Sequence, residues 1–317
     1  MTEGQAADVA AADHATQIFV GHRELLFSVV YNILGSVADT DDVLQETWLS
    51  WATRTRAANA ERVDNPRAYL VRVAVNQALA RRAEIDRRRE TYVGQWLPEP
   101  VVTPLADTSG AGGAGDAADA ADAAVRADSA SMALLVVLET LTPAERAVFV
   151  LHEVFGYAHT EIAGLLGRSP AAVRQLAHRA REHVHARRPR YHADPRLRRE
   201  VTERFLSAAL GGDLKALLQV LAPDVTLWTD GGGKGPATSL HPVRGRDAVA
   251  RTLLTVAANA RDLVVRYRRV NGDPSAVLFD SASPIAVLVL DLTPDSHRVR
   301  GIYSVTNPDK LARIDDR

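Results

Sequence analysis

Apolar residues recur at helical spacing through the first third of the chain, which predicts helices rather than strands. The pattern predicts three helices, over residues 15–34, 39–54 and 65–89. Gly35 suits the end of the first, because glycine readily adopts the conformation that follows a helix. Asn65 and Pro66 suit the start of the third, as a capping residue and a first-turn proline. We therefore expect an all-helical domain over 13–90.

Helical spacing returns over 129–190, where it predicts a helix-turn-helix. Thr142 and Glu145 form the sequence pattern of a capping box, which predicts a helix that ends near Gly156. A short helix over 159–166 and a longer one over 170–187, capped by Ser169, follow, and Gly167 ends the short one. The longer helix has its apolar positions at Val173, Leu176, Ala177, Ala180 and Val184.

A polar stripe on this last helix is the main candidate for DNA binding. It contains Arg174, His178 and Arg181, with Gln175 and Arg179 beside it. Long hydrogen-bond donors opposite a small apolar face are what a helix needs to enter the major groove. The alternative is a helical hairpin with a solvated arginine face.

The last part of the chain, 194–317, changes from helices to strands. It opens with helices over 195–210 and 214–221, and another is expected over 247–259. The pattern predicts strands over 225–229, 263–270, 276–279, 285–292 and 299–305. Helices followed by a meander of strands predict an α+β domain with a curved sheet.

Between the two helical domains we expect a linker, residues 91–128. Residues 101–128 are mostly Ala, Gly, Asp, Ser and Thr, with too little apolar surface to offset the entropy of ordering. The preceding WLPEP segment, Trp96–Pro100, is too aromatic and rich in proline to be a simple spacer. Its Trp96 would make a preorganised apolar anchor.

Composition narrows the classes of function only a little. The chain has no Cys, which excludes disulfides and thiolate metal sites, and its net charge is −1. It shows no signal peptide and no apolar stretch that approaches a membrane span, so we expect a cytoplasmic protein. Nearly all basic residues are arginine, and the only lysines are Lys215, Lys234 and Lys310.

Two polar faces mark the first domain. Asp39, Asp42 and Glu46 share one side of the second helix, which on its own reads as a solvated surface. The third helix combines an apolar stripe with basic and amide side chains, which suit melted or single-stranded DNA. These side chains belong to Arg72, Asn76, Arg81 and Arg82.

These segments resemble the two domains of extracytoplasmic-function sigma factors, in the order of that family and separated by a linker. The resemblance rests on 39–52, 65–82 and 141–184. It implies that 39–49 docks on RNA polymerase core and that 65–82, with the loop 53–64, melts and reads the downstream promoter element. It assigns the upstream element to 168–181, which adds Arg168 and Ser169 to the DNA contacts. The polymerase contacts that it implies are Asp39, Asp42, Val43, Gln45, Glu46, Trp48 and Leu49.

The remaining motifs resemble those of the sigma subgroup that carries a fused SnoaL-like domain at its C-terminus. The three motifs are WLPEP, DGGGK (Asp230–Lys234) and NPDKL (Asn307–Leu311). Gln95 departs from the proline expected before the tryptophan. We expect these motifs to make regulatory contacts through Trp96, Leu97, Pro98, Glu99, Pro100, Asp230, Gly231, Gly232, Gly233, Lys234, Asn307, Pro308, Asp309, Lys310 and Leu311. For the three glycines, an ordinary loop is the alternative.

The predicted fold is thus multidomain: two all-α sigma domains, the second with a helix-turn-helix, and then an α+β SnoaL-like cone. The predicted function is an alternative sigma factor that binds polymerase core and promoter DNA, regulated in cis through intramolecular contacts. We expect no catalytic residue, cofactor, metal or membrane partner, and no required anti-sigma factor. The rival is an enzymatic or small-molecule-sensing C-terminal domain, with Asp224, Asp230 and His241 as acid–base candidates.

Overall fold

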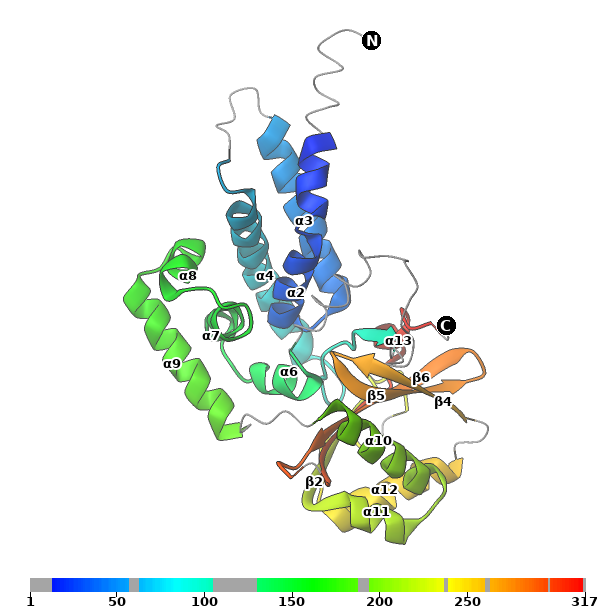
Figure 1. Ribbon diagram of the computed structural model, residues 1–317. Helices are drawn as coiled ribbons and strands as arrows, with labels where there is room; N and C mark the ends of the chain where they lie inside the picture. Colours follow the sequence, from blue (N-terminus) through cyan, green and yellow to red (C-terminus); the bar gives the residue numbers. More distant parts are fainter. Residues whose placement is uncertain are drawn as a thin grey trace. The chain divides into compact units, whose positions relative to one another are not determined.

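The computed structural model describes residues 13–56, 63–104, 130–187, 194–236, 239–259, 263–295 and 297–315 (Figure 1). These residues divide into two units. The first unit holds described residues 13–87 and 137–187, and the second holds 88–104, 130–136 and those from 194 onward. The predicted linker 91–128 is therefore not a separate segment where it is described, because 91–104 belongs to the second unit.

The first unit begins with the predicted helices, but two of their boundaries differ. Its opening elements are a helix over 13–20, α2 (Arg23–Leu34), α3 (Val37–Arg56) and α4 (Pro66–Glu90). The single helix expected over 15–34 is interrupted at Gly21, a residue that disfavours helix interiors. The second helix begins before Asp39, because Ser36 caps it by accepting a hydrogen bond from Asp39 N at 3.2 Å.

The later helices of the chain's α-helical part follow the predicted boundaries closely, apart from α6, for which no boundary was predicted. They are α6 (Met132–Leu138), α7 (Pro143–Phe149), the π-helical turn η1 (Val150–Val154), α8 (His159–Leu166) and α9 (Pro170–Arg187). The capping box of Thr142 and Glu145 is confirmed. Gly167 ends α8 in the left-handed region, with φ 61°. This turn gives α8 and α9 the predicted helix-turn-helix arrangement.

A mixed sheet organises the second unit. In the part of the chain that is described it has seven strands, in the order β1-β4-β5-β6-β7-β2-β3. They are β1 (Val102–Pro104), β2 (Leu221–Asp230), β3 (Val243–Arg244), β4 (Leu263–Val270), β5 (Asp273–Asp280), β6 (Ser283–Leu292) and β7 (Val299–Val305). All pairs are antiparallel except β2 and β7. The α+β prediction is confirmed, but β1 was expected to be linker.

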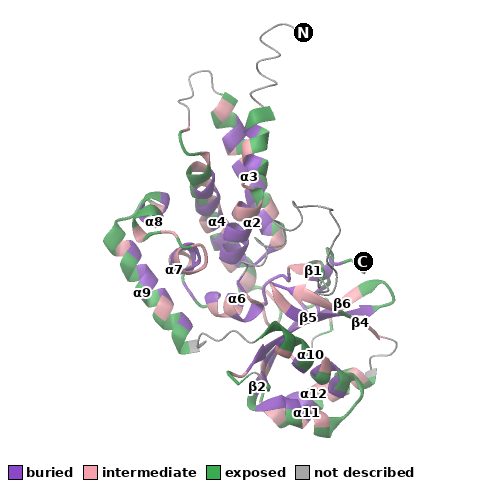
Figure 2. Ribbon diagram, viewed as in Figure 1, coloured by how far each residue is buried: buried purple, intermediate pink, exposed green. Residues whose placement is uncertain are grey.

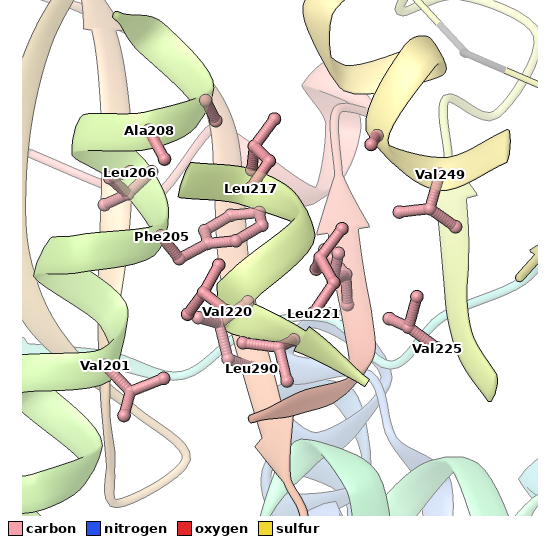
Figure 3. Packing of buried hydrophobic residues seen from close by; sticks show 14 of the residues in the cluster. Val201, Phe205, Leu206, Ala208, Leu217, Val220, Leu221, Val225, Val249 and Leu290 are labelled. Carbon is pink, nitrogen blue, oxygen red and sulfur yellow. The ribbon is translucent and has the colours of Figure 1, made fainter. Parts of the chain in front are cut away.

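Helices cover one face of this sheet (Figure 1). They are α10 (Pro195–Leu210), α11 (Leu214–Val220) and α12 (Arg246–Asn259). Phe205, Leu217, Val220 and Leu290 point toward one another in the core between them (Figure 3). Because strand residues alternate between faces, Val289, the neighbour of Leu290 on β6, packs in a core on the other face.

The opposite face of the sheet has a second apolar core. Val277, Phe279 and Val305 pack there against residues from three distant segments. Those residues are Leu97, Met132, Ala133 and, from the short helix α13 (Pro308–Leu311), Leu311. Leu97 and Met132 stand on either side of residues 105–129, so this core gathers part of the predicted linker and the start of the predicted second domain.

Candidate functional site

The outer side of α9 carries three of the residues predicted to contact DNA. Arg174, Gln175 and His178 are exposed, whereas Val173 and Ala180 on the other side are fully buried. Exposed and buried residues alternate along α9 in Figure 2. This division leaves long polar side chains available on a helix that its apolar face anchors. It is the arrangement that reading the major groove requires.

Two further arginines of α9 are engaged by acidic residues. The Arg179 Nε lies 3.0 Å from a Glu145 carboxylate oxygen, and the Arg181 Nε lies 3.6 Å from one of Glu153. Arg168 and Ser169 are exposed at the turn before the helix. Arg179 and Arg181 would therefore exchange these ion pairs for phosphate or base contacts.

The predicted DNA contacts of α4 do not share one accessible face. Arg72 and Asn76 are exposed. Arg81 is half-buried, and its guanidinium pairs with Asp39 at 3.0 Å and also with Asp42. The loop expected to read DNA with this helix, 53–64, lies partly outside the described residues.

Arg82, another predicted DNA contact, is only 3% exposed and belongs to a buried ionic cluster. Its guanidinium lies 2.5 Å from one Glu139 carboxylate oxygen, and that of Arg146 lies 2.6 Å from the other. Arg146 also donates to the Asn32 carbonyl at 2.9 Å, and Arg82 donates to that of Leu34 at 3.3 Å. The cluster thus joins α2 and α4 to the chain entering α7. In this arrangement Arg82 cannot reach DNA.

The residues predicted to bind polymerase divide between the surface and the interior of the first unit. Asp42, Gln45, Glu46 and Leu49 are exposed on α3. Their three- and four-residue spacing places them on one side of the helix. The remaining three are Asp39 and Val43, which are buried, and Trp48, whose ring centroid lies 5.4 Å from that of Phe19.

The three regulatory motifs meet in the second unit around one buried carboxylate. Asp230 is fully buried and accepts hydrogen bonds from Leu97 N at 2.8 Å and from Lys310 Nζ at 2.7 Å. It also accepts a hydrogen bond from the Tyr92 hydroxyl. Burial and the bond to Asp230 raise the pKa of Tyr92, so the hydroxyl stays protonated and donates.

Aromatic rings cover the cation at the centre of this cluster. Lys310 Nζ lies 3.9 Å from the centroid of the Trp96 ring and 5.3 Å from that of Tyr92. Asn307 Nδ2 donates to the Tyr92 hydroxyl at 2.8 Å. A compact ammonium fits this space between rings and carboxylate, which accounts for a lysine in an arginine-rich chain. We call Tyr92, Trp96, Leu97, Asp230, Asn307 and Lys310 the linker clamp.

Close packing against the clamp requires a glycine at position 232 of DGGGK. A Cβ on Gly232 would lie 2.3 Å from Asn307 Nδ2, and Gly232 has φ 60°. A Cβ on Gly235, just after the motif, would lie 2.0 Å from the Thr306 carbonyl oxygen. At the surface, Lys234 Nζ lies 2.6 Å from an Asp309 carboxylate oxygen.

The other motif residues support the clamp rather than form it. Pro98, Glu99 and Pro100 are buried as the chain continues from Leu97 toward β1. Gly231 is also buried, Gly233 and Pro308 are exposed, and Leu311 joins the adjacent core. Tyr92 was not among the predicted residues, although it stands four residues before Trp96.

A cavity of about 670 Å³ lies on the helix-covered face of the sheet. Asp224, Asp230 and His241, the acid–base candidates, do not line it. Asp224 and His241 are exposed, and Asp230 is held in the clamp. The three side chains are thus not brought together at this cavity.

These features define a sigma-70-type protein with a third domain, of α+β type, at its C-terminus. Residues 18–88 match Sigma-70 region 2, 131–184 match Sigma-70 region 4, and 202–303 match the SnoaL-like domain family. The chain belongs to the extracytoplasmic-function (ECF) RNA polymerase sigma factors.

Similar proteins span nearly the whole chain. The ECF RNA polymerase sigma factor SigJ of Mycobacterium tuberculosis is 37% identical over 309 residues, covering 92% of each chain. The probable ECF RNA polymerase sigma factor SigI of the same species is 30% identical, covering 94% of this chain and 95% of the relative. The crystal structure of Mycobacterium tuberculosis SigJ superposes with a TM-score of 0.69 at 35% identity, covering 94% of this chain and 98% of that one. Among the described residues, no helix combines the length and apolar character that crossing a bilayer requires.

Proposed function

We propose that this sigma factor directs promoter-specific initiation by RNA polymerase and that its C-terminal domain controls it in cis. The exposed face of α3 docks on polymerase core. The exposed side of α4 contacts the downstream promoter element, and α8 and α9 read the upstream one. The C-terminal domain acts as a binding and regulatory module rather than as an enzyme, and a separate anti-sigma factor is not required.

The proposal of cis control rests on one observation: residues on both sides of the linker pack against the sheet of the C-terminal domain. Leu97 follows region 2, Met132 lies at the start of region 4, and both are buried in one core beside β5 and β7. The clamp fastens the first of these segments through Asp230 and Lys310. Holding both ends of a linker together limits how far the domains that it joins can separate. Two promoter elements are then difficult to reach at once.

The buried ionic cluster of the first unit supports the same closed arrangement. Glu139 is shared by Arg82 and Arg146, and separating region 2 from region 4 would break this shared pairing. Opening would also free Arg82 for the predicted contact with DNA. Polymerase core, by binding the open form better, would shift the equilibrium toward it.

The test is run-off transcription with purified polymerase core on a promoter library. It compares the full chain with one that ends before Asn307 and so lacks Lys310. We expect transcripts from the same promoters with both proteins, in larger amount from the shortened one. An absence of promoter-specific transcripts from both would contradict the sigma activity, and equal amounts would contradict control by the C-terminal segment.

A further inference from the structure

Two histidines lie against each other inside the helix-turn-helix domain. The ring centroids of His152 and His159 are 4.1 Å apart, and their ring planes are inclined by 32°. His152 belongs to the π-helical turn η1 and His159 is the first residue of α8, so the pair lies where these two elements meet. Whether the two rings are neutral or charged therefore affects how η1 and α8 pack.

The hydrogen bonds around the pair favour a neutral ring at His159. His152 Nδ1 donates to the Tyr157 carbonyl oxygen at 2.8 Å, because a carbonyl oxygen can only accept. His159 Nε2 is buried, and within the described part of the chain it has no hydrogen-bond partner. A protonated imidazole carries an N–H at both nitrogens, so a proton on His159 would leave a buried donor of a charged ring unpaired.

The charges near His159 add to the cost of protonating it. Burial lowers the pKa of His159, and the neighbouring His152 lowers it further. Arg181 and Arg174 on α9 act in the same direction. Glu153 on η1 opposes them, but its carboxylate pairs with Arg181 at 3.6 Å. The first residue of a helix also lies at the positive end of the helix dipole, which disfavours a cation there.

One more cation approaches the pair from region 2. The Arg67 guanidinium on α4 lies 5.8 Å from the centroid of the Tyr157 ring, and the carbonyl of Tyr157 holds His152. On α8 itself, the Glu161 carboxylate accepts a hydrogen bond from Ala158 N at 2.7 Å and so caps that helix. The surroundings of the pair thus disfavour a further positive charge.

The start of α8 is closely connected to the proposed recognition helix α9. Gly167 ends α8, and in the same turn Arg168 N donates to the Ala163 carbonyl at 3.0 Å. Ile162 on α8 and Val173 on α9 are fully buried in the domain. Because a short turn and a shared apolar core join the two helices, a displacement of α8 changes how α9 presents its polar side chains.

We propose that the His152–His159 pair makes the helix-turn-helix sensitive to acid: a proton on His159 loosens the junction of η1 and α8 and weakens reading of the upstream promoter element. The folded domain lowers the pKa of His159. The neutral ring therefore stabilises the junction fully above the unfolded pKa of about 6.5, and this stabilisation is lost as the pH falls below it. The loosening stands on the pair itself, whereas its effect on promoter reading rests on the proposed function.

The first arm measures amide hydrogen exchange of the full-length protein at about pH 7.5 and about pH 5.5, where most carboxylates stay ionised. Protection factors, corrected for the intrinsic pH dependence of exchange, are compared between η1 with α8 and the helix α3, which contains no histidine. We expect acid to lower protection in η1 and α8 about fivefold more than in α3. An equal change in both places would overturn the switch.

Substitutions assign this effect to the pair. His159→Gln cannot take up the proton and should abolish the extra loss of protection. His152→Asn keeps a donor for the Tyr157 carbonyl but removes the adjacent ring, so it should reduce the loss. His183→Gln, exposed on α9, is the matched control and should behave as the wild type does. The wild-type pH profile in folded His159→Gln, or in folded His152→Asn if the first variant does not fold, would overturn the proposal.

The second arm measures binding of the polymerase holoenzyme to promoters with matched and scrambled upstream elements at the same two pH values. The ratio of the two affinities should fall about fivefold in acid for the wild type and His183→Gln, and stay constant for His159→Gln. The same fall in His159→Gln would overturn the effect on promoter reading. A ratio of one already at about pH 7.5 would instead contradict the proposed role of α9, and the exchange arm would still decide the switch.

Discussion

At the scale of single residues, close packing and a buried ion pair explain why the regulatory motifs contain these residue types. Asp230 has three donors around it, and Lys310 lies between a carboxylate and two rings. A buried carboxylate that loses its cation keeps the cost of desolvation without the compensating attraction. The same logic applies to Glu139 between its two arginines.

Substitution of Gly235 tests the packing beside the clamp. Gly235→Ala should destabilise the ends of β2 and β7 by about 1–3 kcal/mol, because its Cβ would overlap the Thr306 carbonyl oxygen. Amide hydrogen exchange of these two strands would measure the effect. Gly164→Ala is the control, since a Cβ there meets nothing within 4 Å. Unchanged exchange in Gly235→Ala would contradict the packing described.

The residues of the regulatory motifs could be predicted from the sequence, but the buried ionic cluster around Glu139 could not. The lysines were notable against an arginine-rich background, and Trp96 stood out beside prolines. Glu139 gave no signal, because its partner Arg82 lies more than fifty residues away. Periodicity predicts which side of a helix is buried, but not which distant residue it meets.

At the scale of elements, helix boundaries were predictable where proline, glycine or a capping residue fixes them. Pro66, Pro170 and Gly167 stand where expected. Strand β1 was not predictable, because three residues of a polar-looking linker pair with the edge of β4. An edge strand takes its stability from its neighbour's hydrogen bonds rather than from its own pattern.

The prediction at this scale concerns α9, the proposed recognition helix. Arg174→Ala should weaken binding of the polymerase holoenzyme to a promoter selected from the library by about tenfold and relax the preference for its upstream element. Fluorescence anisotropy with matched and scrambled upstream elements measures both effects. Arg251→Ala, exposed on α12 of the second unit, is the control. If Arg174→Ala retained full affinity and preference, the assignment of α9 would be wrong.

At the scale of the whole molecule, two sigma domains and a SnoaL-like domain are linked by more than chain connectivity. The segment after region 2 and the first residues of region 4 share a core with the C-terminal sheet. The order of domains was predictable from motifs. The shared core was not, because it depends on contacts between residues far apart in the sequence, such as Leu97 and Val305.

The most direct measurement is run-off transcription at limiting polymerase core with Lys310→Ala beside wild type. Breaking the pair with Asp230 should release the linker, so we expect more transcript from the same start sites. Lys215→Ala, exposed on α11, should match the wild type. Equal transcript from Lys310→Ala and wild type would contradict the claim that the clamp restrains this sigma factor.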